Sequence, residues 1–156
     1  MLTDFPEHNL ENMGGISTFS FIQQYGVSSF PFINGNKINT LPTLKVAYTW
    51  LEGVALLKSV KFDEVPKETD SGKLIDYTVS GFYPGHAPDI SELFDEMMDQ
   101  PFMLDTIDNN NQRRLLGNLN NPVSFKFNYS SPPGGRPGYS FSFMWTSPNP
   151  ASFYVP

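Results

Sequence analysis

The sequence has no cysteine, few charged residues and no long apolar run. Without cysteine, disulfide scaffolds, thiolate zinc sites and cysteine nucleophiles are excluded. No stretch reaches the roughly 18 consecutive apolar residues that a membrane-spanning helix needs. Residues 1–15 carry acidic groups and lack both the basic and the apolar regions of a secretory signal. We therefore expect no membrane partner and a chain that is made and folded in the cytoplasm.

Basic residues are scarce as well. Ten Lys and Arg stand against 16 Asp and Glu, which gives a formal net charge of -6. This balance argues against nucleic acid as a partner, because such binding depends on Lys and Arg that neutralise phosphates. The charged fraction of 17% is below the roughly 25% of an ordinary soluble domain. A surface wetted mainly by Asn, Ser and Thr is easily desolvated, which favours a subunit that packs against neighbours.

Strand-forming residues dominate what is present. The length of 156 residues suits a single domain over 1–156, which we expect to begin with an irregular arm at 1–15. Apolar and polar residues alternate most regularly in the second half of the chain. The patterns predict strands at 16–22, 43–50, 55–64, 74–82, 102–107, 112–117, 123–129 and 139–145.

The expected turns have distinct chemistry. Asn34-Gly35 favours a tight hairpin, and Asn in the turn 108–111 tolerates left-handed backbone. The polar segment 66–73 is longer than a two-residue turn, so we expect a mobile hairpin tip there. Segment 130–138, rich in Pro and Gly, predicts a stiff exposed loop between two antiparallel strands. The aromatic residues of 147–156 predict an edge strand.

One segment has helical periodicity. Asp89 and Glu92 have the spacing of a capping box, and Pro101 marks the end of the helix. The apolar face predicted for this helix consists of Ile90, Leu93, Phe94, Met97 and Met98. The sequence thus predicts a mainly β (α+β) fold: an antiparallel β-sandwich or barrel with one short amphipathic helix near residues 89–99.

Catalytic chemistry has little support in the sequence. The two histidines, His8 in the arm and His86 in a Pro-Gly turn, are far apart and accompany no nucleophile motif. We interpret both as exposed turn residues. Their separation also gives no metal-ligand spacing. We predict no catalytic, cofactor-binding or metal-binding residue.

Two groups of carboxylates suggest a cation site or a glycosidase pair. The first is Asp95, Glu96 and Asp99, which we interpret as the solvated face of the helix. The second is Asp105 with Asp108, which lacks the residue order of a calcium loop. The glycine-rich segment 134–138 is followed by neither Lys-Ser/Thr nor a helix start, so we interpret it as a loop rather than a phosphate cradle.

Aromatic residues on the strands allow a second hypothesis. Exposed Tyr or Trp side chains stack on sugars, and a carbohydrate-binding module would present Tyr139 or Trp145 around a groove. Alternating aromatic residues in strands are more commonly sheet core. The sequon at 128–130 has no secretory signal to support its glycosylation.

Three stretches carry a resemblance to a known class of protein. They are Asn12-Met13-Gly14-Gly15-Ile16, the turn and strand of 108–117 followed by Asn121-Pro122-Val123, and Gly138-Tyr139-Ser140-Phe141-Ser142-Phe143. Together they resemble small structural proteins from prophage clusters of gut-dwelling Gram-negative anaerobes. The resemblance implies a component of a virion or its tail, and it carries over no catalytic residue.

Two functions from different classes follow. The first is a non-enzymatic subunit of a phage tail or head-tail junction, such as a tail tube, tail-completion or neck component. It would form homo-oligomeric rings through edge strands and through segments 66–73 and 130–138. The second is a small β-sandwich that binds carbohydrate or another ligand.

Overall fold

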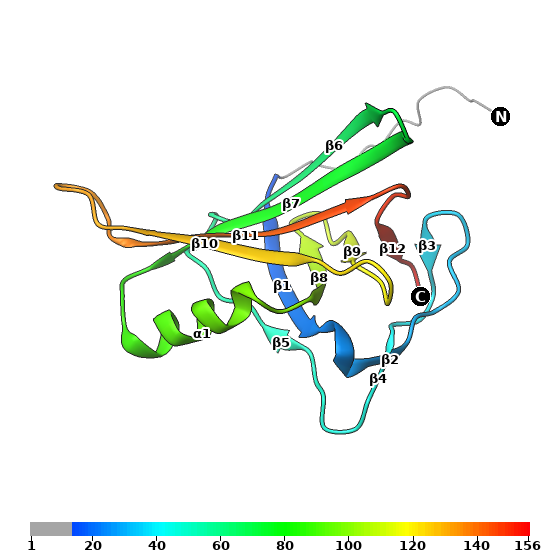
Figure 1. Ribbon diagram of the computed structural model, residues 1–156, viewed down its shortest axis with the longest axis horizontal. Coiled ribbons are helices and arrows are strands. Elements are labelled where there is room, and N and C mark those ends of the chain that lie inside the picture. Colours follow the sequence, from blue (N-terminus) through cyan, green and yellow to red (C-terminus); the bar gives the residue numbers. More distant parts are fainter. Residues whose placement is uncertain (1–13) are drawn as a thin grey trace.

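The computed structural model describes residues 14–156 as two packed β-sheets and one α-helix (Figure 1). The strands of the two sheets cross steeply, and their inner faces enclose one aromatic core. Neither sheet closes on itself, so the fold is the sandwich of the two predicted architectures. This confirms the predicted mainly β class.

The first sheet has six short strands in the order β3-β12-β9-β8-β1-β5. All neighbours are antiparallel except β12 and β3, which are parallel. Strand β8 lies in the middle and is buried on both faces, whereas β5 and β3 form the edges. The strands are β1 (Ile16–Gln23), β3 (Lys37–Ile38), β5 (Leu51–Glu52), β8 (Phe102–Asp108), β9 (Arg113–Leu116) and β12 (Ser152–Tyr154).

The second sheet has four longer antiparallel strands in the order β10-β11-β7-β6. They are β6 (Lys61–Thr69), β7 (Gly72–Pro84), β10 (Ser124–Ser130) and β11 (Gly138–Ser147). A separate pair consists of β2 (Val27–Ser29) and β4 (Thr43–Leu44), and a 3-10 turn, η1 (Gln24–Gly26), precedes it.

Strand β11 shows why these residues form a sheet. Its bulky residues Tyr139, Phe141, Phe143 and Trp145 are buried at every second position, while Ser140 between them is exposed. This is the period of a strand with one face on a core. Burying each such ring contributes about 1.5 to 3 kcal/mol. The predicted antiparallel pairing of this strand with 123–129 is confirmed by β10.

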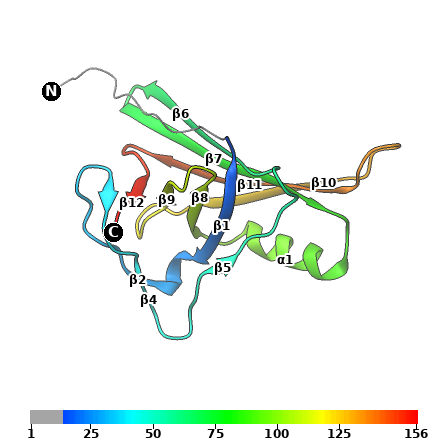
Figure 2. The same ribbon diagram turned by 180° about the vertical axis from the view of Figure 1, so that it is seen from behind.

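The one α-helix within residues 14–156, α1 (Pro88–Met98), joins β7 of one sheet to β8 of the other (Figure 2). Its position confirms the predicted helix, but the predicted capping box is wrong. The N-cap is Ala87, which has no side-chain hydrogen bond, and Pro88 takes the first helical position. Asp89 accepts a hydrogen bond from the neighbouring Ile90 N–H, at 2.8 Å.

The buried face of α1 is narrower than the sequence predicts. Phe94 and Met97 are buried, and Ile90 is partly buried. Leu93 and Met98 are 45% and 46% exposed, so the predicted apolar face is only partly covered. Phe94 packs against Phe125 of β10, with 5.3 Å between the ring centres.

Two predicted strands are wrong in the first half of the chain. Of the strand at 43–50, only Thr43–Leu44 is extended and paired, because Ala47 has a left-handed φ of 71°. The prediction at 55–64 fails before Lys61, since Lys58 also has a positive φ of 62°. Residues with a Cβ rarely adopt this conformation, so the sequence does not signal either break.

The ends of two other elements also differ from expectation. The predicted long tip at 66–73 is a two-residue turn, Asp70-Ser71, because β6 and β7 remain paired up to Thr69 and Gly72. The predicted edge strand at 147–156 is β12, which lies inside the sheet between β3 and β9. The expected irregular arm lies outside the described residues, apart from Gly14 and Gly15.

Within residues 14–156, no helix is long and apolar enough to cross a membrane.

Candidate functional site

Of the two histidines, the structure describes His86 alone. His8 lies outside the described part of the chain. His86 is exposed and stacks on Tyr129, with 4.2 Å between the ring centres. Within residues 14–156, no three His, Asp or Glu side chains gather closely enough to hold a metal ion.

The helix carboxylates Asp95, Glu96 and Asp99 are all exposed. Glu96 accepts a long hydrogen bond from Gln100 at 3.4 Å. The glycine-rich segment 134–138 belongs to an exposed loop that ends where β11 begins. The three carboxylates thus form a solvated acidic surface on α1, and segment 134–138 is part of a connecting loop.

Asp105 and Asp108 are buried and form ion pairs with the two adjacent arginines. Arg113 approaches Asp105 with two nitrogens: Nε lies 3.0 Å from Oδ1 and Nη2 lies 2.6 Å from Oδ2. Arg114 Nη2 donates to Asp108 Oδ2 at 2.9 Å. The hydrogen bonds to Asp105 raise the pKa of Arg113 above its ordinary value. Since arginine already occupies both carboxylates, they serve as a structural cluster rather than a cation site.

The same two arginines also contact aromatic rings of β6 and β12. The Arg114 guanidinium lies 4.0 Å from the ring centre of Phe62 in β6 and 5.7 Å from that of Phe153 in β12. Arg113 lies 5.0 Å from the ring centre of Tyr154. Cation-π contacts of this kind stabilise by about 0.5 to 2 kcal/mol. The ion pairs thus join the 108–112 turn, β6 and β12.

Tyr77 adds further hydrogen bonds at the end of the sandwich where β12 and the arginine pairs lie. Its hydroxyl donates to Glu64 of β6 and accepts a hydrogen bond from the Ala151 N–H at 2.8 Å. Burial and the hydrogen bond to Glu64 raise the pKa of Tyr77 to about 12. We call the side chains of Tyr77, Asp105, Asp108, Arg113 and Arg114 the polar closure.

The aromatic residues proposed for sugar binding are not exposed. Tyr139 and Trp145 are only 1% and 6% exposed. Trp145 donates its indole N–H to the Asn121 carbonyl at 3.1 Å and packs on Tyr77, with 5.4 Å between the ring centres. The prediction of an exposed platform at either residue is therefore wrong, because both side chains point into the core.

The helix end of the sandwich contains an apolar cavity of about 260 Å³. It lies between α1, residues 53–54 directly after β5, and the inner faces of both sheets. At Gly53, an added Cβ would lie 1.9 Å from the Phe19 ring, so glycine allows the chain to pass against that ring. The cavity is lined mainly by rings and by Ile90, Leu93 and Met97 of the helix, and its charged lining residue is Glu52.

Two segments project from this body. The β6–β7 hairpin extends beyond the sandwich on one side, and the loop between β10 and β11 extends on the other (Figure 1). Every residue of loop 131–137 is exposed, as are the hairpin residues 64–73.

Comparisons with protein-family models, with curated proteins and with solved structures find no match for this chain. The features that bear on function are the cavity, the projecting segments and the sheet edges.

Proposed function

We propose that this protein is a non-enzymatic structural subunit of a phage or prophage particle. It is made in the cytoplasm and then joins the virion as a tail tube, tail-completion or neck component. There it contacts copies of itself and other tail or head-tail proteins. The observation that carries the proposal is a sandwich whose exposed segments project to opposite sides of its body (Figure 1). Such extensions enlarge the surface that a small subunit offers to its neighbours.

The two edges of the four-stranded sheet differ in their capacity to pair with another chain. In an antiparallel ladder, hydrogen-bonded residue pairs alternate with pairs that are not hydrogen-bonded, and the turn at Asp70-Ser71 sets which are which. The backbone N–H and C=O groups of Glu64, Pro66 and Glu68 therefore face away from β7. Pro66 has no N–H to donate, and the neighbouring charges discourage pairing further. We infer that the β6 hairpin contacts neighbours through side chains and not by adding a strand.

The opposite edge, β10, lacks these features. Its sequence, SFKFNYS, contains no proline and a single charge, Lys126. Strands of this kind extend readily by pairing with a second chain. We therefore assign strand pairing between subunits to β10.

Sedimentation velocity of the full chain over a rising concentration series tests this proposal. We expect concentration-dependent assembly, and negative-stain images of the assembled fraction to show rings. Asn128→Lys places a second positive side chain on the exposed side of β10 and weakens assembly. The matched control, Thr18→Lys, adds the same charge to an exposed residue of β1, a strand inside the other sheet, and leaves assembly unchanged. A chain that stays monomeric throughout overturns the proposal.

A further inference from the structure

The apolar cavity under α1 has room for a side chain from outside the molecule. Its volume of about 260 Å³ exceeds the roughly 150 Å³ that accommodates a benzene ring. Leu93 and Val54, which line it, are 45% and 68% exposed, so the cavity opens to solvent. An open cavity with this lining is filled best by an aromatic or aliphatic group.

The chain itself presents such a group on the loop between β2 and β3. Phe32 is 86% exposed, and its neighbour Ile33 is 43% exposed. The loop is held on both sides: Phe30 packs against the small core cluster of Ile22, Val27 and Met103, and Asn34 exchanges two backbone hydrogen bonds with Lys37, at 2.9 and 3.1 Å. Phe32 and Ile33, which we call the apolar finger, are therefore presented by an anchored loop.

Charge complements this match of size and polarity. Residues 12–51 include no Asp or Glu, and they carry Lys37 and Lys45. Residues 74–112 include no Lys or Arg. Glu52 lines the cavity, and the helix that covers it carries the exposed acids Asp89, Glu92, Asp95 and Glu96. The finger thus belongs to a segment with positive charges only, and the cavity lies under an acidic helix, so the two are complementary in charge.

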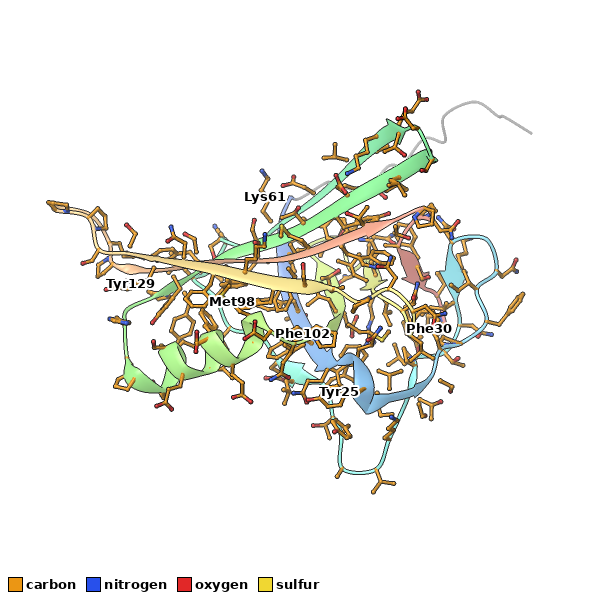
Figure 3. All side chains as sticks on the ribbon, viewed as in Figure 1. Tyr25, Phe30, Lys61, Met98, Phe102 and Tyr129 are labelled. Atoms are coloured by element: carbon orange, nitrogen blue, oxygen red, sulfur yellow. The ribbon has the colours of Figure 1, made fainter. Side chains whose placement is uncertain are left out.

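The loop that carries the finger and the helix that covers the cavity lie apart. The loop before β3 and the helix α1 are separated along the long axis in both views (Figures 1 and 2). The labelled Phe30 and Met98 show the same separation (Figure 3). A chain therefore cannot fill its own cavity, and a contact between finger and cavity joins two chains head to tail.

We propose that the apolar finger of one copy inserts into the cavity under α1 of the next copy. This inference rests on the proposed self-assembly and specifies one of its contacts. A head-to-tail contact repeats without limit unless its rotation closes a ring, so it suits a ring or tube component.

Complementation between two variants tests the contact. Phe32→Ser removes the finger but keeps the cavity, and Leu93→Lys blocks the cavity but keeps the finger. We expect each variant alone to associate at least about tenfold more weakly than the wild type, the loss typical of a central buried aromatic residue. In an equimolar mixture, the Leu93→Lys chain supplies an intact finger and the Phe32→Ser chain supplies an intact cavity. Native mass spectrometry should show more heterodimer in the mixture than the homodimer that either variant forms alone through β10.

Two matched controls separate the contact from general surface effects. Val46→Ser removes an apolar side chain that is 96% exposed in the same acid-free segment. Met98→Lys adds the same charge to α1 at a residue of similar exposure that does not line the cavity. We expect both to assemble as the wild type does. Circular dichroism checks that all four variants keep the fold.

The outcomes distinguish this contact from the proposed function. Wild-type assembly that Phe32→Ser leaves unchanged overturns the contact alone. A mixture whose heterodimer is no more abundant than the homodimer of either variant alone also overturns it. If the wild type is monomeric at every concentration, the proposed function and the contact both fail. Saturable binding of the neutral dye 1-N-phenylnaphthylamine that Leu93→Lys abolishes, with assembly unaffected, would instead assign the cavity to a small apolar ligand.

Discussion

The two ends of the sandwich are closed by different physical means. At the β12 end, the polar closure pairs each buried carboxylate with an arginine and gives the Tyr77 hydroxyl two partners. At the other end, α1 closes the sandwich with Phe94 and Met97 and leaves an apolar cavity. Hydrogen bonds need fixed distances and angles, whereas apolar contacts do not. The first end is therefore fixed in shape, and the second has space for another molecule.

The largest effect is expected from breaking the polar closure. Asp108→Ala removes the partner of Arg114 and the acceptor of the Asn110 and Gln112 N–H groups, at 2.8 and 2.9 Å. Loss of one partner from a buried pair leaves the other charge uncompensated. We expect the free energy of unfolding, measured by urea denaturation, to fall by about 3 kcal/mol. Asp95→Ala, an exposed control, should change it little.

A smaller loss is expected from Tyr77→Phe. The substitution leaves the buried Ala151 N–H without its acceptor, so unfolding should cost about 1.5 kcal/mol less at neutral pH. Folding raises the Tyr77 pKa from 10.0 to about 12, so the folded state favours the neutral phenol. Its contribution is complete below pH 10 and is lost as the pH rises from 10 to 12.

Denaturation of both proteins across this pH range measures the effect. The difference in unfolding free energy between wild type and Tyr77→Phe should shrink above pH 10. A difference that stays constant up to pH 12 would contradict the assigned role of the hydroxyl.

A gain in stability is expected at the end closed by α1. Ile90→Phe adds volume to a helix residue that lines the cavity, and we expect the free energy of unfolding to rise by up to about 1 kcal/mol. The same variant should assemble more weakly, because it occupies the space that the apolar finger would use. Thermal unfolding and sedimentation velocity measure the two effects. A loss of stability would mean that the cavity walls cannot accept the ring.

The smallest effect is expected on the exposed face near the polar closure. Asp76 accepts a hydrogen bond from the Thr146 hydroxyl at 2.6 Å and pairs with Lys67 at 2.9 Å. These contacts lower the pKa of Asp76, that of Thr146 most strongly. Lys67→Met should raise this pKa toward its ordinary value in an NMR titration, without a measurable change in stability, because exposed pairs are screened by solvent.

Local patterns predicted the sheet wherever one face of a strand is buried. The alternation in β10 and β11 and the periodicity of α1 are each visible within about ten residues. The hairpin of β6 was predicted too short, because its charged residues and Pro66 are typical of a loop. They are equally typical of an exposed edge strand, and only the pairing with β7 decides between the two.

The candidate sites were harder to predict. The arginine pairs had a signal in the sequence: Asp105 and Arg113 have opposite charges on either side of the turn predicted at 108–111, in strands that pair. The cavity had none, because its lining comes from β1, β5, β7, α1, β10 and β11, most of which are distant in the chain. Which aromatic residues face a cavity is decided by how the two sheets cross.

Strand β12 has a consequence for the order in which the fold forms. It occupies an inner position of its sheet, and its parallel partner β3 pairs Lys37 with Phe153, so the contact joins distant parts of the chain. Pairs of this kind form late, because a long loop must close first. Until then, β9 is an open edge that accepts one strand, because β3 joins the sheet only through β12. The time during which this edge stays open sets the interval in which a strand from another chain can take the place of β12.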